Sequence, residues 1–239
     1  MPRMMVSTLV WGTSFDDRFM RSRANGMNPP NIAAIILAAG ASTRMGRPKQ
    51  LLPFHGCSLL VRAAQTAIAS GCHPSIVVLG AEIDRIRGDV ETLPVQVAEN
   101  PDWETGMGSS IRIGIQALMA SDPDIEAAIL LLCDRPFVSV RLIDRLVAAY
   151  RSTERPIVAS GYNDTIGVPA LFHRTLFPEL LSLSGVHGAK SLMGRYLTQI
   201  VPIEFPEEAI DLDTPEDYRK ILDLDRYQRT NFAGGTPTK

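Results

Sequence analysis

Short runs of apolar residues recur along this chain, and the stretches between them have helical periodicity. The runs 32–37, 75–79 and 127–132 are almost wholly apolar, which is typical of strands buried on both faces of a sheet. Residues 59–70 lie between the first two runs and have the length of a helix, and the apolar positions that follow Ser139 recur at helical spacing. This alternation predicts an α/β fold: a Rossmann-like, mostly parallel sheet with helices on both faces.

The first apolar run ends in a loop of small residues that carries positive charge. After Leu37 the chain reads Ala-Ala-Gly-Ala-Ser-Thr-Arg-Met-Gly-Arg-Pro-Lys, and residues 31–81 contain no Asp or Glu. Small residues let backbone N–H groups approach phosphate oxygens, while Arg44 and Lys49 supply charge. Ligands of parallel sheets bind beyond the carboxyl ends of the strands, so this loop predicts a phosphate site. Its spacing fits neither the Walker loop nor the dinucleotide fingerprint.

Asp134 is a candidate metal ligand because it directly follows an apolar run and Cys133, and Pro136 then ends strand pairing. The carboxylate should therefore reach the same edge of the sheet as the phosphate loop. Mg²⁺ prefers one or two carboxylates together with phosphate oxygens and water. The alternative is that Asp134 only caps a turn.

Two further segments have the pattern of helix starts. Residues 106–110 precede apolar positions at helical spacing. Free N–H groups and hydroxyls there could bind a base, a ribose or an anion, and N-capping by a serine of this segment fits about as well. Farther along, Thr214, Pro215 and Asp217 predict the capped start of a final helix.

Five stretches, none of them specific alone, carry a combined signature. They read LAAGASTRMGRPKQLLPF (37–54), NPDW with GMGSS (100–103 and 106–110), LLCDRP (131–136), GVPALF (167–172) and DLDTPED (211–217). In this order they resemble the nucleotidyltransferases related to molybdenum cofactor cytidylyltransferase. The resemblance implies a nucleotidyltransferase domain over about residues 31–224, with the fold of the nucleotide-diphospho-sugar transferases.

The resemblance also implies a reaction. An acceptor phosphate attacks the α-phosphate of CTP, or of another nucleoside triphosphate, and pyrophosphate leaves. The implied acceptor is molybdopterin, usually already carrying molybdenum, and the product is a cytosine dinucleotide cofactor for an enzyme of the xanthine dehydrogenase type. The chain has Ala39-Gly40 where guanosine-using relatives tend to have two glycines, which favours CTP.

Residue roles follow from these motifs. We expect Arg44 to bind the β- and γ-phosphates and Lys49 the α-phosphate, and these two with Asp134 are the catalytic candidates. Mg²⁺ is the expected cofactor, bound by Asp134 and by Asp211 or Asp213. The latter two would lie on one side of an extended strand, and we rank Asp211 first. The nucleotide-binding candidates are Leu37, Ala38, Ala39, Gly40, Ser42, Arg44, Gly46, Lys49, Gly106, Gly108, Ser109 and Ser110.

Two positions depart from the family pattern and leave the acceptor open. Arg135 stands where relatives often have Gln, and Val186 stands where relatives often have Asp. One alternative is the same chemistry on a sugar phosphate or another phosphorylated metabolite. The other is a non-catalytic accessory protein that binds the cofactor and hands it to a molybdoenzyme. Val186 favours the accessory protein, whereas the cationic loop and Asp134 favour catalysis.

Composition limits the class and location of the protein. A length of 239 residues with 45% hydrophobic residues suits one large α/β domain or two small ones, and a net charge of −2 argues against a general nucleic-acid binder. No apolar run approaches the roughly 20 residues of a membrane span. Three cysteines without a C-x-x-C pair predict a reduced, cytoplasmic protein. Residues 1–30 should be a disordered extension, or upstream sequence ahead of a start at Met27, and residues 225–239 a disordered tail.

Overall fold

The computed structural model describes residues 31–153, 155–162, 165–185, 188–205 and 212–232, with side chains as far as Tyr227. The chain divides into two units, residues 1–30 and 31–239. The first unit, for which the sequence predicts a disordered extension, lies outside the described residues, and so do residues 233–239. Every element named below belongs to the second unit.

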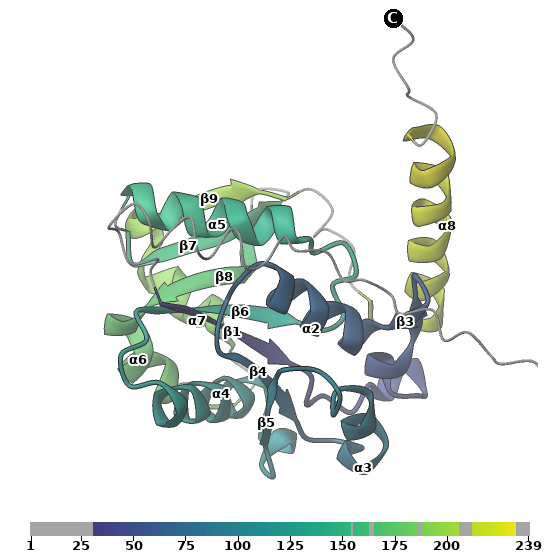
Figure 1. Ribbon diagram of the computed structural model, residues 1–239, viewed down its shortest axis with the longest axis horizontal. Coiled ribbons are helices and arrows are strands. Elements are labelled where there is room, and N and C mark those ends of the chain that lie inside the picture. Colours follow the sequence, from purple (N-terminus) through teal and green to yellow (C-terminus); the bar gives the residue numbers. More distant parts are fainter. Residues whose placement is uncertain (1–30, 154, 163–164, 186–187, 206–211, 233–239) are drawn as a thin grey trace, which may run out of the picture. The chain divides into compact units, whose positions relative to one another are not determined.

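Within the described residues, seven strands form one sheet in the order β5-β4-β1-β6-β8-β7-β9 (Figure 1). β8 runs antiparallel to both of its neighbours, and the other neighbouring pairs are parallel. The sheet is therefore mostly parallel, as predicted, and the three apolar runs have become β1, β4 and β6. The strands are β1 (Ile32–Leu37), β4 (Ser75–Leu79), β5 (Gln96–Glu99), β6 (Ala127–Leu132), β7 (Ile157–Tyr162), β8 (Thr165–His173) and β9 (Ile200–Glu204).

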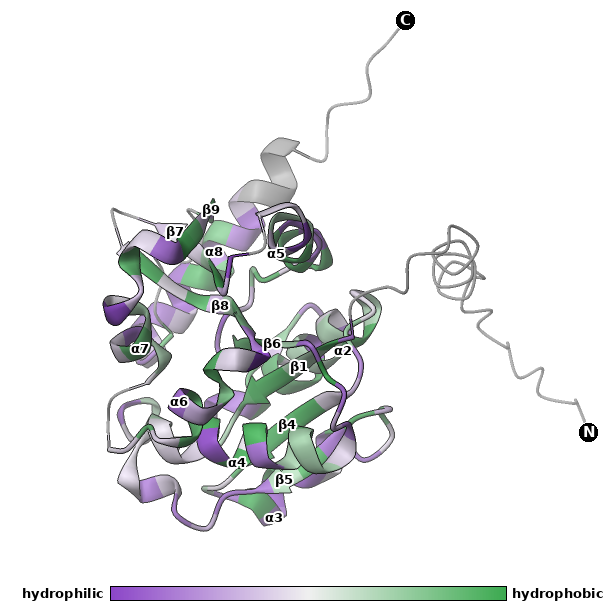
Figure 2. Ribbon diagram, turned by 90° about the vertical axis from the view of Figure 1, so that its left-hand side faces the viewer, coloured by the Kyte–Doolittle hydropathy of each residue, from purple (hydrophilic) through white to green (hydrophobic). Residues whose placement is uncertain are grey.

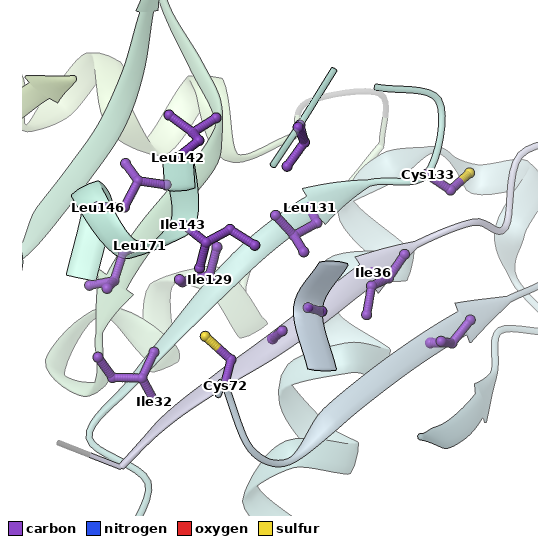
Figure 3. Close-up of a cluster of buried hydrophobic side chains, with 14 of the residues drawn as sticks. Ile32, Ile36, Cys72, Ile129, Leu131, Cys133, Leu142, Ile143, Leu146 and Leu171 are labelled. Carbon is purple, nitrogen blue, oxygen red and sulfur yellow. The ribbon is translucent and has the colours of Figure 1, made fainter. Parts of the chain in front are cut away.

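Helices cover both faces of this sheet because successive side chains of a strand point to opposite sides. Ile36 packs with α2, α3 and α5 on one face, and Ile35 packs with α4, α6 and α7 on the other. Figure 3 shows the first of these two cores, with Ile36 and Leu131 drawn on neighbouring strands. The helices are α2 (Leu59–Ala69), α3 (Ile83–Ile86), α4 (Met107–Ser121), α5 (Val140–Thr153), α6 (Phe177–Leu181), α7 (Ala189–Arg195) and α8 (Pro215–Phe232).

Figure 2 colours the residues by hydropathy, and the hydrophobic ones are concentrated along β1, β4 and β6.

The described residues also form short 3-10 helices between these elements. They are η1 (Thr43–Met45), η2 (Lys49–Leu51), η3 (Arg87–Asp89), η4 (Trp103–Thr105), η5 (Arg174–Leu176) and η6 (Leu197–Gln199).

Local side-chain bonds begin three helices where the sequence predicted. Ser58 Oγ accepts a hydrogen bond from a first-turn N–H of α2 at 3.2 Å, and Ser139 Oγ does the same for α5 at 3.3 Å. At the start of α8, Asp217 N donates to Thr214 Oγ1 at 3.2 Å and Thr214 N donates to Asp217 Oδ2 at 3.0 Å. This reciprocal arrangement is a capping box, which confirms the predicted start of the final helix.

The final helix is longer than predicted. The composition of residues 225–239 predicted a disordered tail, but α8 continues to Phe232. Asp225 Oδ1 lies 2.8 Å from His55 Nε2, and two ion pairs at i,i+3 and i,i+4 spacing run along the helix. The two ion pairs are local contacts that favour helical turns, and the contact with His55 connects the helix to a distant part of the chain. No helix in the described part of the chain is long and apolar enough to cross a membrane.

A third, smaller core joins α8 to the loop after β1. Tyr218 of α8 donates its hydroxyl hydrogen to the carbonyl of Pro53 in β2 (Pro53–Phe54), the strand that pairs with β3 (Cys57–Ser58). The segment that leads into α8 is thus anchored beside the loop after β1. The buried members of this core are Met45, Leu52, Phe54, Leu59, Leu212, Tyr218 and Ile221.

The chain connections diverge where β1 and β6 lie side by side. β1 pairs with β4 on one edge and with β6 on the other, and Leu37 is in register with Leu132. α2 follows β1 on one face, whereas α4 leads into β6 on the other face. Such a switch point is where open α/β sheets bind ligands. The loop after β1 and Asp134 both lie there, as predicted.

Candidate active site

A buried glutamine organises the loop after β1. Gln50 is 1% exposed, and its Nε2 donates to the carbonyl oxygens of Ala38 and Gly40, both at 2.8 Å. Its Oε1 accepts from the Ser42 hydroxyl at 3.3 Å, and Ser42 Oγ accepts from Lys49 N at 3.1 Å. Gln50 is not among the predicted site residues, although a polar residue between Lys49 and two leucines was a visible signal.

Two residues in the left-handed region of φ turn the loop after β1 and leave Arg44 exposed. Ser42 has a φ of 56° and Gly46 has a φ of 71°, the region that glycine adopts most readily. Between them, Met45 is 4% exposed and belongs to the third core. The neighbouring Arg44 side chain is 70% exposed. The buried methionine therefore fixes the loop while Arg44 reaches outward.

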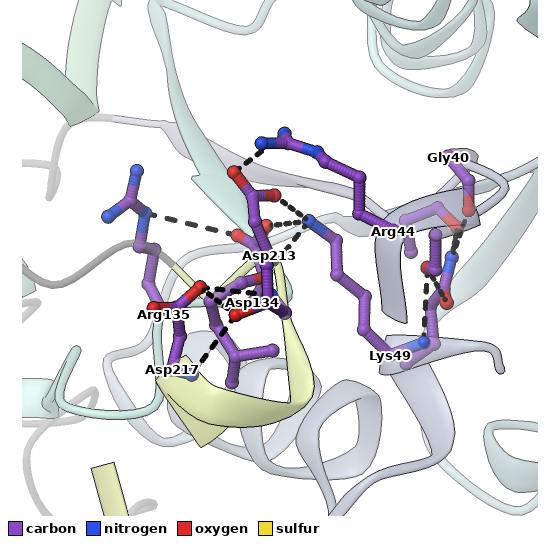
Figure 4. Close-up of polar contacts among 12 residues, drawn as sticks. Gly40, Arg44, Lys49, Asp134, Arg135, Asp213 and Asp217 are labelled. Atoms are coloured by element: carbon purple, nitrogen blue, oxygen red, sulfur yellow. Dashed lines mark hydrogen bonds and ion pairs between the residues drawn. The ribbon is translucent and has the colours of Figure 1, made fainter. Parts of the chain in front are cut away.

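Four charged side chains from three distant segments meet at this loop (Figure 4). Lys49 Nζ donates to Asp134 Oδ2 and lies 3.5 Å from Asp213 Oδ1, while Arg44 Nη2 lies 2.7 Å from Asp213 Oδ2. The Lys49 and Asp134 side chains are only 18% and 15% exposed. The fold thus brings together both predicted cations and two of the predicted metal ligands. Asp211, which we ranked first, lies outside the described residues.

The site holds Lys49 in its charged form. Burial lowers the pKa of Lys49, but attraction from Asp134, a hydrogen bond to that carboxylate and the charge of Asp213 outweigh burial and raise the pKa overall. The neighbouring thiol of Cys133 is instead held in its neutral form. Burial, followed by the negative charge of Asp134, raises the pKa of Cys133 to about 12. Cys133 is therefore not a thiolate at neutral pH, in line with a reaction that needs no nucleophilic cysteine.

The carboxylates fit a hard divalent cation. Asp134 Oδ1 is buried and accepts no hydrogen bond from the described residues, and Arg135 Nε lies 3.9 Å from it. No group of three or more His, Cys, Asp or Glu among the described residues could hold a metal by itself. Two carboxylates around one ammonium instead suit a cation that takes its other ligands from phosphate oxygens and water, as Mg²⁺ does.

A second buried amide organises the loop before α4. Asn100 is 2% exposed, and its Nδ2 donates to Ser109 Oγ at 2.8 Å and to Ser110 Oγ at 3.0 Å. α4 begins at Met107, so both serines lie inside its first turn, and no side chain caps it. The alternative of serine N-capping is therefore wrong. Contact between the nucleotide and the predicted set Gly106, Gly108, Ser109 and Ser110 stays a prediction.

Two other basic residues lie within residues 31–81, the segment without Asp or Glu, and contact neighbouring parts of the site. Arg62 Nε donates to the carbonyl of Pro136 at 2.7 Å, and its guanidinium lies 5.2 Å from the centre of the Phe54 ring. The Arg47 guanidinium lies 6.0 Å from the centre of the Tyr218 ring. These contacts hold the loop after β6 and the start of α8 in place.

Ala39 and Gly40 have different surroundings. A methyl group on Gly80 would come within 2.9 Å of Ala39 Cβ and 2.6 Å of Trp103 Cβ, so Ala39, which is 4% exposed, packs tightly at the end of β4. A methyl group on Gly40 would meet no atom within 4 Å beyond its two chain neighbours, which leaves room for a ligand at this residue.

Comparison with known proteins shows the family. Residues 34–200 match the family described as "MobA-like NTP transferase domain". The chain belongs to this family. This MobA-like chain is 32% identical over 207 residues to nicotine blue oxidoreductase of Paenarthrobacter nicotinovorans, which covers 81% of the chain and 97% of the relative. It is 29% identical over 197 residues to molybdenum cofactor guanylyltransferase of Rhodobacter capsulatus, which covers 80% and 95%.

Solved structures agree with the fold. The crystal structure of Rv0371c from Mycobacterium tuberculosis H37Rv is 28% identical to this MobA-like chain, covers 82% of it and 99% of Rv0371c, and has a TM-score of 0.70. A structure of Rv0371c in complex with manganese has a TM-score of 0.65 and covers 81% of the chain and 98% of Rv0371c. The predicted fold class is confirmed, and the chain is a nucleotidyltransferase of the MobA-like type.

Proposed function

We propose that this MobA-like protein transfers CMP from CTP to the phosphate of a molybdopterin-type acceptor and releases pyrophosphate, in a reaction that depends on Mg²⁺. The observation that carries the proposal is the position of Lys49 Nζ between Asp134 and Asp213, with Arg44 bound to the outer oxygen of Asp213. Cations suited to phosphates and carboxylates suited to a metal ion thus lie together at the carboxyl edge of the sheet.

In this reaction an oxygen of the acceptor phosphate attacks the α-phosphorus of the nucleotide, and the bond from that phosphorus to pyrophosphate breaks. Lys49, nearly buried and held in its charged form, would neutralise the α-phosphate, and its low exposure and positive charge support this role. Arg44, largely exposed, would bind the β- and γ-phosphates. Catalysis then rests on positioning and on stabilising charge. An acceptor phosphate is already ionised, so no general base is required.

Asp134 and Asp213 would hold Mg²⁺, with Asp211 as the further candidate outside the described residues. When bound, the cation neutralises developing charge on phosphoryl oxygens. The buried Asp134 Oδ1, which accepts no hydrogen bond among the described residues, supports this role. The manganese complex of Rv0371c shows that a protein of the same fold binds a divalent cation.

The choice of substrates rests on the family. The Ala39-Gly40 pair of the loop favours CTP, and a relative named molybdenum cofactor guanylyltransferase supports a molybdopterin acceptor. Arg135 adds a cation beside Asp134, which suits an anionic acceptor. We place the reaction in the cytoplasm, where the free thiols of Cys57, Cys72 and Cys133 would stay reduced, and we propose a xanthine dehydrogenase-type enzyme as the recipient.

Pyrophosphate release tests the proposal. The protein is supplied with Mg²⁺, molybdopterin with or without molybdate, and CTP, GTP, ATP or UTP in turn. We expect release with CTP alone, reduced at least about 100-fold in Asp134→Ala. The matched control is Asp124→Ala, an exposed aspartate before the opposite end of β6, which should leave release unchanged.

The other outcomes are equally informative. Release with another nucleotide would keep the chemistry and overturn the choice of CTP, and release with a sugar phosphate would change the acceptor. Absence of release from folded protein that binds molybdopterin would support an accessory protein, for which Val186, outside the described residues, is the motivating departure.

A redox activity is the second candidate, because one relative is named nicotine blue oxidoreductase. Oxidation of NADH or NADPH in the presence of a redox substrate would measure it. Redox turnover that is unchanged in Asp134→Ala, with no pyrophosphate released by any nucleotide, would replace the proposed transferase reaction.

A further inference from the structure

Gln50 is a buried polar side chain at this site that the proposed reaction does not use. It is uncharged and 1% exposed, and a polar group so buried needs hydrogen-bond partners. Its partners are the backbone carbonyls of Ala38 and Gly40 and the hydroxyl of Ser42. Every one of these groups belongs to the loop after β1, so Gln50 determines how that loop presents its backbone.

The direction of the carbonyls fixes the direction of the next N–H groups. In a trans peptide unit the C=O and the following N–H point in opposite directions, and the described cis peptides lie elsewhere in the chain. The carbonyls of Ala38 and Gly40 face Gln50, so the N–H groups of Ala39 and Ala41 point away from it. Neither N–H has a backbone acceptor within the described residues.

Open space and positive charge at this loop suit an anion. A methyl group on Gly40, the residue between Ala39 and Ala41, would meet no atom within 4 Å beyond these two neighbours. Lys49 and Arg44 lie at the same loop. Successive backbone N–H groups beside cations form a concave site that binds phosphate oxygens.

We propose that Gln50 is a positioning residue that directs the N–H groups of Ala39 and Ala41 toward the nucleotide's phosphates; the inference rests on the proposed binding of the nucleotide at this loop. A primary amide is suited to the task because one nitrogen carries two N–H donors, one for each carbonyl, while its oxygen accepts from Ser42. A carboxylate has no donor and would repel both carbonyls.

Backbone amide NMR of the wild-type protein tests the donors directly. CTP with Mg²⁺ is added in one titration and inorganic triphosphate in another. The N–H signals of Ala39 and Ala41 should shift downfield and be among the largest changes in both titrations. Binding of either probe without these shifts would overturn the inference. Binding of triphosphate but not of CTP, with both shifts present, would support the inference and remove the proposed cytidine substrate.

Variants of Gln50 test whether its side chain is needed for triphosphate binding. Gln50→Glu removes the donors at nearly constant shape, and Gln50→Met keeps the volume without polarity, so it serves if the first variant does not fold. Each should weaken triphosphate binding about 10- to 100-fold, the effect that removing a group which orients a metal ligand has on metal affinity. The matched control is Gln96→Glu, an exposed glutamine bonded to Ser121 Oγ at 2.7 Å, which should leave binding unchanged.

The pH dependence separates positioning from general destabilisation. In Gln50→Glu the introduced carboxyl regains one donor when it is protonated, and burial favours that neutral form. Its binding constant relative to wild type should therefore recover as the pH is lowered, whereas Gln50→Met should show no recovery. Wild-type affinity in folded Gln50→Met would overturn the role of Gln50 and leave the proposed function standing. Failure of the wild-type protein to bind either probe would overturn both.

Discussion

Lys49→Met should separate the structural role of the Lys49 charge from its role toward phosphate. The substitution keeps the length of the side chain but leaves Asp134 and Asp213 without their shared ammonium group. Removing one partner of a buried ion pair lowers the free energy of unfolding by about 3–5 kcal/mol. Asp134 is 15% exposed and Asp213 31% exposed, so water relieves part of this cost. We expect the free energy of unfolding to fall by about 2 kcal/mol.

Arg44→Met is the matched control because it removes the other phosphate-binding cation from the same site. Arg44 lies 2.7 Å from Asp213 but is 70% exposed, and exposed ion pairs contribute less than about 1 kcal/mol. A domain of this size changes its Tm by about 2–4 °C per kcal/mol. Lys49→Met should therefore lower the Tm by about 4–8 °C and Arg44→Met by less than half as much, while both lose pyrophosphate release.

Thermal unfolding followed by circular dichroism, in EDTA and without nucleotide, measures this difference. In an Asp134→Asn background the carboxylate charge is already gone. Lys49→Met should therefore lower the Tm by less than it does in the wild-type protein. A Tm of Lys49→Met equal to that of wild type, or an equal loss for the two cation variants, would refute the reasoning. Either result would mean that the buried contact between Lys49 and Asp134 does not form in solution.

Three further predictions concern the rest of the site and the cores. Gly114→Ala should destabilise the protein by about 1–2 kcal/mol, because its methyl group would lie 2.5 Å from a β1 side chain, whereas Gly40→Ala should leave the Tm unchanged and weaken triphosphate binding. Tyr218→Phe removes the hydrogen bond to the β2 carbonyl and should lower the free energy of unfolding in urea by about 1 kcal/mol; an unchanged value would contradict the docking of α8. Burial raises the pKa of Cys72 to about 11 and of Cys133 to about 12. In the unfolded protein both thiols ionise at lower pH, so the free energy of unfolding should fall as the pH rises above about 8.5. The fall should reach up to roughly 1.4 kcal/mol per pH unit for each thiol. Urea unfolding across that range should show a shallower fall in Cys72→Ala and in Cys133→Ala, and equal slopes would contradict their burial.

The sequence alone determined the elements whose signals are local. Apolar runs of five or six residues are short for a buried helix and typical of strands covered on both faces, and β1, β4 and β6 have the predicted bounds. Ser58, Ser139 and Thr214 begin helices because their hydroxyls accept N–H groups of the next turn. Arg44, Lys49 and Asp134 were predictable because loops after parallel strands meet at one edge.

Only the tertiary structure decided which distant side chains meet. Asp213 reaches Lys49 because the third core anchors the start of α8 beside the loop after β1, and no local pattern encodes that contact. Gln50 acquired its role in the same way, since the two carbonyls that it bonds turn toward it only when the loop is folded. Asp225 of the final helix likewise meets His55, a residue far earlier in the chain. Periodicity and caps act over one or two turns, whereas burial and ion pairing act between segments that are neighbours only after folding.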